Sequence, residues 1–246
     1  MRLVAFDIAA ILLVACLVAL AVWQIHRRAY KLDLIARVEA RVHAAPMAAP
    51  GPDRWTGISP AADEYRRVTA SGDWLEDRPT LVQAVTELGG GYWVMTPLAR
   101  DDGTTILVNR GFVPATAREP ASWQPRSPEP VTITGLLRMS EPGGGFLRAN
   151  DPESDRWYSR DVSAIAASRG LNNVAPYFID AERVPGQDGL PVAGLTVISF
   201  SNNHLVYALT WGALALMAAA GAIFVNMDQL RPDWFGRRDS DLREPR

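Results

Sequence analysis

Two long apolar runs, one near each end of the chain, dominate its pattern of hydrophobic and polar positions. The run 3–23 is apolar except for Asp7, and the run 205–225 contains no charged residue. Each is about 20 residues long, which at about 1.5 Å of rise per residue is enough to cross about 30 Å of hydrocarbon. The pattern therefore predicts two transmembrane helices, over 3–23 and 204–226.

The residues after the first run follow a helical pattern with polar positions between the apolar ones. From Tyr30 to Ala45, apolar residues recur at spacings of three and four, as is typical of an amphipathic helix. An Ala- and Pro-rich stretch then ends at Pro52. We therefore expect an amphipathic stalk helix and a linker over residues 24–52.

Residues 53–200 show the short β-prone runs and turn residues of one soluble domain. The strongest hairpin signal is Asp101-Asp102-Gly103 between two such runs, and we also expect a turn at the glycines 89–91. The predicted strands are 65–69, 81–85, 92–98, 104–109, 131–137, 177–180 and 195–200.

A single helical turn is expected before these strands, and one short helix is expected among them. Ser59 and Pro60 have the residue types that begin a helical turn. Asp161 can cap a short helix that Gly170 ends. The predicted fold is two transmembrane helices flanking a mostly antiparallel β domain, barrel- or sandwich-like, with one short helix.

The ends of the chain raise two further questions. Ala19-Leu20-Ala21 has the small residues of a signal-peptide cleavage site, but Trp23 followed by Arg27 and Arg28 favours a retained, anchored helix. Arginines lie near the membrane on both sides, so charge does not decide the orientation. The charged tail 227–246 is expected to be disordered.

Composition excludes several functions. Cys16 is the only cysteine and lies in the first run, so the soluble domain has no disulfide or thiolate metal site. Lys31 is the only lysine, which excludes a phosphate-binding loop of the GxxxxGK[ST] kind. A net charge of −2 gives no indication of a nucleic-acid partner. We find no catalytic constellation, so a membrane-anchored enzyme is the weaker alternative.

His204 is the strongest candidate for chemistry among the three histidines. It begins the second run, where water meets lipid, and it shares a helix face with Tyr207 and Trp211. Such a face suits a planar cofactor that the imidazole ligates and the aromatic rings flank. The alternative is an aromatic belt with a histidine at the helix end.

The topology predicts that a second group of residues lies at the same depth in the membrane as His204. The end of the first span and the start of the second lie at one membrane face, so Trp23, Gln24, Arg27 and Arg28 are expected beside His204. The arginines would meet the propionates of a bound haem through charge-assisted hydrogen bonds. Anchoring among lipid headgroups is the alternative role.

Three motifs resemble those of the Surfeit locus protein 1 family. They are Trp23-Gln24 with Arg27, Tyr30 and Lys31, the segment 91–114, and the segment 202–211 with sequence NNHLVYALTW. Order and spacing are kept from Trp23 to about Val225. The departures from the family pattern are Tyr30 in place of tryptophan, Phe112 in place of tryptophan or tyrosine, and Leu195 in a stretch that usually has glycine and threonine.

This resemblance implies a role in assembling cytochrome c oxidase, with haem a as cofactor and His204 as the iron ligand. It also implies a multi-pass protein of the bacterial inner membrane with its β domain in the periplasm and its tail in the cytoplasm. We expect oxidase subunit I, haem a synthase and membrane lipid as partners, and partner contact through Gly91, Arg110, Gly111 and Phe112. A cofactor-free scaffold for subunit I is the alternative.

Overall fold

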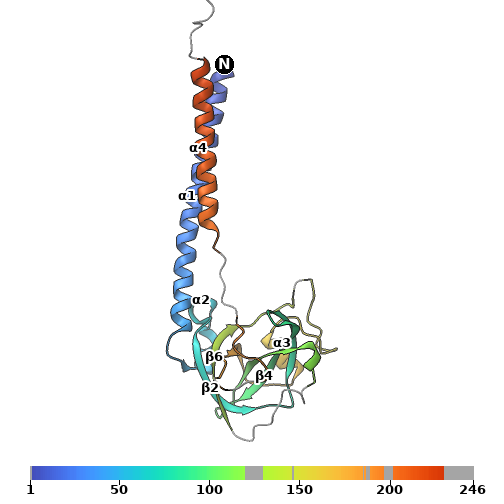
Figure 1. Ribbon diagram of the computed structural model, residues 1–246. Helices are drawn as coiled ribbons and strands as arrows, with labels where there is room; N and C mark the ends of the chain where they lie inside the picture. Colours follow the sequence, from blue (N-terminus) through green and yellow to red (C-terminus); the bar gives the residue numbers. More distant parts are fainter. Residues whose placement is uncertain are drawn as a thin grey trace, which may run out of the picture. The chain divides into compact units, whose positions relative to one another are not determined.

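The computed structural model describes residues 2–119, 130–145, 147–184, 186, 189–196 and 202–229. These residues fall into two compact units. One contains the first helix up to Ile35 together with the last helix, and the other begins at Ala36 and contains every described strand (Figure 1).

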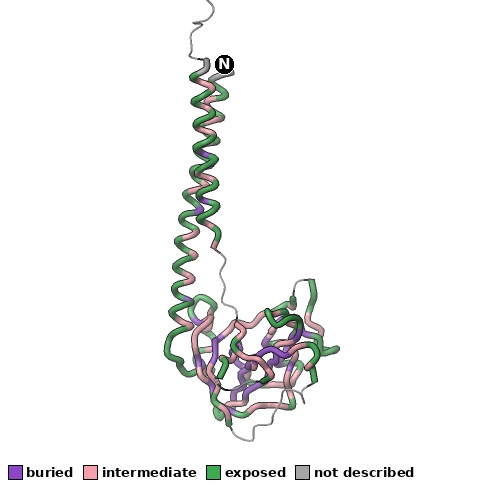
Figure 2. The backbone as a smooth tube through the Cα atoms, viewed as in Figure 1, coloured by how far each residue is buried: buried purple, intermediate pink, exposed green. Residues whose placement is uncertain are grey.

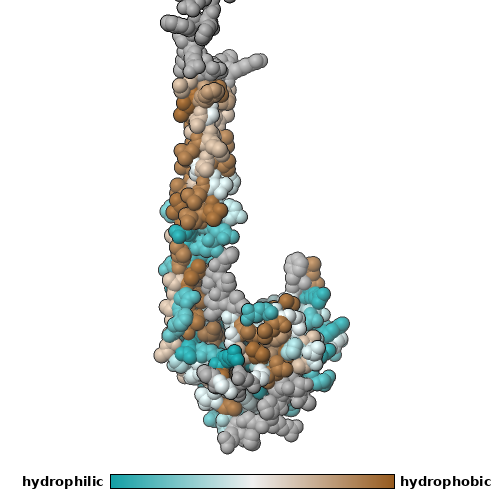
Figure 3. All heavy atoms as spheres, viewed as in Figure 1, coloured by the Kyte–Doolittle hydropathy of each residue, from teal (hydrophilic) through white to brown (hydrophobic). Residues whose placement is uncertain are grey.

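Two long apolar helices, α1 (Arg2–Val42) up to Ile35 and α4 (His204–Gln229), make up most of the described part of the first unit. Both are long and apolar enough to cross a membrane, and apolar side chains cover most of their visible surface (Figure 3). The prediction of two spans is confirmed, and the chain is a membrane protein. The expected stalk is continuous with the first span, because residues 24–41 contain no glycine or proline to end the helix.

Seven strands form one sheet that closes on itself. Their order is β1-β2-β6-β7-β5-β4-β3, and a further pairing of β2 with β4 closes five of them into a barrel. The pairs β1–β2 and β5–β7 are parallel and the others antiparallel, so the mostly antiparallel barrel is confirmed. The bounds are β1 (Met47–Ala48), β2 (Arg67–Trp74), β3 (Thr80–Thr86), β4 (Gly89–Ala99), β5 (Thr105–Pro114), β6 (Val131–Met139) and β7 (Val174–Ala181).

Short helices fill the connections, and the predicted caps are present. The Ser59 side chain accepts a hydrogen bond from the Ala62 amide at the start of α2 (Pro60–Asp63). Asp161 does the same for Ala164 at the start of α3 (Val162–Ser168). The described connections also contain two 3₁₀ turns, η1 (Pro52–Gly57) and η2 (Ala115–Ala117).

Alternating side chains of β5 belong to two different apolar clusters. Buried residues gather in the strands of the barrel, as the purple segments of the tube show (Figure 2). Ile106 and Val108 belong to the larger cluster, with residues of β2, β6 and β7. Leu107 points to the opposite face, where it packs with Trp157 and with Ile165 of α3. Each face of this strand is therefore buried.

Three glycine and strand predictions need correction. The glycines 89–91 begin β4 instead of forming a turn, and β2 continues through Gly72. A Cβ at Gly72 would lie 2.1 Å from the carbonyl oxygen of Ala99, so glycine is what lets β2 approach β4 and close the barrel. Of the predicted strand 195–200, residues 195 and 196 are not in a strand, and residues 197–200 lie outside the described residues, as do 230–246 of the tail.

Candidate functional site at the helical hairpin

The two spans pack along a line of buried residues, here called the seam. On α1 the buried members are Leu17 and Gln24, and on α4 they are Ala208 and Ala215. Each pair is seven residues apart, which returns to the same helix face after two turns. Small alanines on α4 allow the two backbones to approach closely.

A hydrogen bond between the helices lies at one end of the seam. The Nδ1 atom of His204 is 2.8 Å from the Oε1 atom of Gln24. An amide oxygen only accepts hydrogen bonds, so Nδ1 carries a proton, and in the neutral imidazole Nε2 then keeps its lone pair. No described residue is recorded as a hydrogen-bond partner of Nε2. The pairing thus favours the neutral tautomer that ligates a metal through Nε2.

The two aromatic residues that follow His204 on α4 differ in how far they are buried. Trp211 is half-buried and lies about two turns along the same face of α4. Tyr207 is 53% exposed, at the flank of that face. One buried polar atom lies close by in sequence: Oδ1 of Asn202 has no hydrogen-bond partner among the described residues.

The residues of α1 that were predicted to lie beside His204 also differ in their burial and orientation. Arg28 is half-buried and lies one turn after Gln24, on the same face. The Arg27 guanidinium stacks 5.4 Å from the ring centre of Tyr30, and Trp23 is 56% exposed. The hairpin therefore brings Gln24 into contact with His204, and it leaves Trp23 facing outward.

A second polar contact between the spans was not predicted. The Nδ2 atom of Asn226 donates to Oδ1 of Asp7 at 2.9 Å and to the carbonyl of Ala222 at 3.0 Å. Asp7 was visible as the one charge in the first run, and this pairing satisfies part of its hydrogen-bonding capacity within an apolar surrounding.

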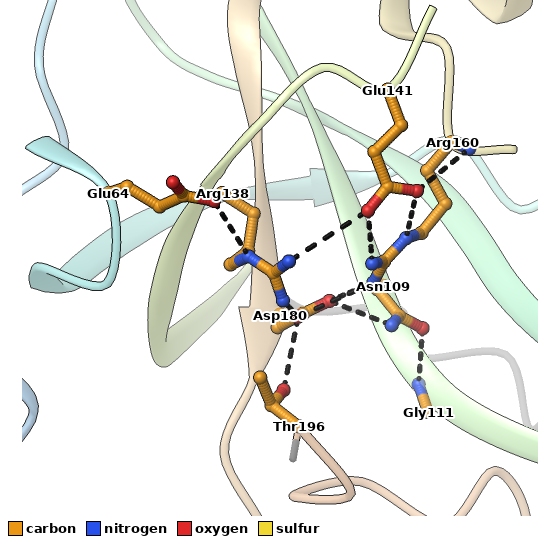
Figure 4. A network of polar contacts seen from close by, with 8 residues as sticks. All are labelled: Glu64, Asn109, Gly111, Arg138, Glu141, Arg160, Asp180 and Thr196. Carbon is orange, nitrogen blue, oxygen red and sulfur yellow. Dashed lines mark hydrogen bonds and ion pairs between the residues drawn. The ribbon is translucent and has the colours of Figure 1, made fainter. Parts of the chain in front are cut away.

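A network of polar side chains in the barrel surrounds Asp180 (Figure 4). Its carboxylate accepts hydrogen bonds from Asn109, Arg138, Arg160 and Thr196 at 2.8–3.0 Å. Arg160 also binds Glu141 through two nitrogens. Burial opposes ionisation of Glu141, but Arg160 outweighs it and lowers the pKa of this carboxyl.

This network pairs its carboxylates with arginines and leaves none poised as a general base. No group of three or more His, Cys, Asp or Glu residues suited to a metal ion occurs in the described ranges. The contacts join β5, β6 and β7, so the arrangement supports a structural role in the barrel.

Three of the four predicted partner-contact residues have packing roles. Phe112 is 1% exposed, and a Cβ at Gly91 would lie 2.6 Å from its ring. Gly111 has a φ of 131°, and its Cβ would meet the Val192 backbone. Their contact with a partner stays a prediction.

Arg110 is the fourth of these residues, and it stacks 4.9 Å from the ring centre of Trp74. Burial lowers the pKa of Arg110, partly offset by the nearby charge of Glu76. Its Nη1 atom has no hydrogen-bond partner in the described part of the chain.

Comparison with known proteins identifies the family. The SURF1 family model matches residues 11–216. Surfeit locus protein 1 of Homo sapiens is 36% identical over 215 residues, covering 80% of this chain and 69% of that protein. A SURF1-like protein of Monosiga brevicollis is 35% identical over 243 residues, covering 92% and 87%. With these matches across both spans and the barrel, the chain belongs to the SURF1 family.

Proposed function

We propose that this protein is an assembly factor for cytochrome c oxidase that holds haem a through His204. The observation that carries the proposal is the hydrogen bond between Gln24 and His204. Histidines that ligate metals usually donate their other ring N–H to an acceptor, which fixes the tautomer and the ring orientation. Gln24 serves as that acceptor, so it is a positioning residue and Nε2 of His204 is the iron ligand.

The surrounding residues fit a haem in their chemistry. When bound, the haem would supply an iron centre, and the imidazole of His204 would ligate it. Trp211 and the exposed ring of Tyr207 offer apolar surface for the macrocycle. Arg28 and Arg27 offer guanidinium groups for the two propionates. Asn202 has a buried polar atom that remains available for a further contact.

The partners and the orientation belong to the same proposal. Oxidase subunit I would receive the cofactor, and haem a synthase would supply it. The barrel lies in the periplasm of a bacterial inner membrane and the chain termini in the cytoplasm. In a Cys16→Ala background, Glu87→Cys in an exposed turn should react with a membrane-impermeant maleimide in intact spheroplasts. Labelling only after lysis would place the barrel in the cytoplasm.

A cofactor-free scaffold is the second candidate, and the same hydrogen bond favours it. Polar side chains that bond across transmembrane helices stabilise their packing by about 1 kcal/mol. In that role, the contact of Gln24 with His204 would hold the hairpin together at one end as Asn226 and Asp7 do at the other. The protein would then bind subunit I without haem.

The first experiment is a reduced-minus-oxidised absorption spectrum of the full-length protein in detergent, from cells that make haem a. We expect a haem a band in the parent protein and in His26→Ala, whose exposed histidine is the matched control. His204→Ala should lose the band while remaining inserted and folded. Gln24→Leu should hold haem at least about tenfold more weakly, as expected for loss of an outer-shell partner.

Two outcomes contradict haem binding. Equal haem content in His204→Ala and the parent would remove the ligand assignment. No band in any protein, together with copurification of oxidase subunit I, would establish the scaffold instead.

A further inference from the structure

Strand β3 has an open outer edge over its second half. Its inner edge pairs with β4 along the whole strand, from Thr80 to Thr86. On its outer edge it forms one isolated bridge, between Val82 and Trp157, in which the Gln83 amide donates to the Trp157 carbonyl at 2.8 Å. The described residues include no such partner for the strand beyond Gln83.

Strand geometry places the backbone of Val85 on this open edge. In an antiparallel pair, alternate residues direct their N–H and C=O groups away from the partner strand. The outward bond of Gln83 sets this alternation, so the N–H and C=O of Val85, two residues on, also point outward. These unpaired groups are the template onto which a further strand adds.

The surface beside this edge is apolar and concave. The Val85 side chain is 90% exposed, and the residue opposite it on β4 is Gly90, which has no side chain to cover it. A pocket of about 580 Å³ lies here, lined by Gln83, Val85, Gly90, Tyr92, Arg148 and Tyr158 among others. The glycine leaves room for side chains of an added strand.

Two arginines give the rim of this pocket a positive charge. Arg148 stacks 5.5 Å from the ring centre of Tyr158, and Arg118 stacks at the same distance from Tyr92. Neither guanidinium forms an ion pair with a carboxylate of the described residues, and Arg148 makes only a 3.4 Å hydrogen bond to Gln83. An acidic side chain of a bound segment would supply the missing charge.

We propose that the edge of β3 at Gln83–Thr86 binds an extended, acidic segment of a partner protein as an additional strand. Backbone hydrogen bonds would give affinity, and the pocket with Arg148 would give specificity. A second copy of this chain fits less well, because a two-fold interface places the same patch on both subunits and would oppose the arginines to each other. The proposal needs no cofactor, so it goes beyond haem binding and does not depend on it.

The test uses full-length protein in detergent and two fluorescent peptides of about seven residues, the length of a strand. One alternates valine with glutamate and the other alternates valine with lysine. Fluorescence anisotropy should show binding of the acidic peptide at least about tenfold tighter than that of the basic one, because charge complementarity contributes to affinity here.

Two variants and a matched control locate the site. Val85→Pro removes an outward N–H without removing a bond to β4, and it should weaken binding by about tenfold. Val85→Thr keeps the N–H and should bind like the parent. Arg148→Glu reverses the charge without altering the strand, so it should abolish the preference for the acidic peptide even if the proline variant folds poorly.

The proposal is overturned if both peptides bind alike, or if Val85→Pro and Arg148→Glu bind the acidic peptide like the parent. Sedimentation analysis provides the third decisive result. A dimer of the parent that Val85→Pro abolishes would assign this edge to self-association and overturn the acidic partner.

Discussion

Replacing Asp180 with alanine should lower the free energy of unfolding of the barrel by about 3 kcal/mol. The carboxylate is 3% exposed and accepts hydrogen bonds from four side chains, two of them guanidinium groups. Breaking a buried ion pair from one side costs about 3–5 kcal/mol, because a charge remains buried without its partner. Arg138 and Arg160 each keep a contact with Glu141, so we expect the lower end of that range.

The measurement is urea unfolding of the full-length protein in detergent, followed by tryptophan fluorescence. Trp157 is 1% exposed, so its exposure to water on unfolding of the barrel should change the summed emission of the eight tryptophans. Asp151→Ala is the matched control, since Asp151 binds Arg156 at 2.7 Å but at the surface, and it should not change the midpoint measurably. A loss below about 1 kcal/mol for Asp180→Ala would refute the reasoning, because it would mean that the buried network contributes no more than one ordinary hydrogen bond.

Two further predictions concern packing and pH. Gly91→Ala should destabilise the barrel by about 1–3 kcal/mol in the same urea assay. The added Cβ would lie 2.2 Å from the Val113 carbonyl oxygen and 2.6 Å from the Phe112 ring. An unchanged unfolding midpoint would contradict this account of the glycine. Because the fold lowers the pKa of Glu141 below 4.5, its ionised form adds stability above that pH, and this contribution is lost as the pH falls below it. The stability difference between parent and Glu141→Gln should therefore shrink on acidification below pH 4.5, and a constant difference would argue against the pairing with Arg160.

Local patterns in the sequence were enough to predict the elements whose causes are local. The two spans follow from apolar length alone, and the start of α3 follows from Asp161 at its N-cap. The β4–β5 hairpin follows from its turn residues, and Gly103 has the positive φ of 75° that such a turn requires.

The predictions about glycine failed where its role depends on distant residues. Gly91 was assigned to a turn, and the predicted strand 65–69 stopped short of Gly72, although each glycine lies within a strand where a side chain would collide with a neighbouring backbone. A turn glycine and a close-packing glycine look alike in a single sequence, because only the position of the opposing strand distinguishes them.

The candidate site was predicted in part. Helix topology alone indicated that Gln24 and His204 lie at one level, and the structure places them in direct contact. That Gln24 rather than an arginine meets the imidazole depends on the rotation of each helix about its axis, which apolar runs do not specify. The side chains that bond Asp180 come from as far as 71 positions away, so the network left no local pattern to find.

Closure of the barrel through β2 and β4 has a consequence for how the chain folds during synthesis. Strand β2 pairs Arg67 with Leu136, and β5 pairs Thr105 with Val174, so the ladders that complete the barrel join segments far apart in the sequence. Such non-local pairing forms slowly, because loop closure must precede the contacts that stabilise it. The central edge of β5 stays open until β7 has left the ribosome, and His204 follows only 23 residues after Ala181. Closing the barrel and emergence of the second span are therefore nearly simultaneous events, and a chain delayed between them would expose the unpaired edge of β5 to aggregation.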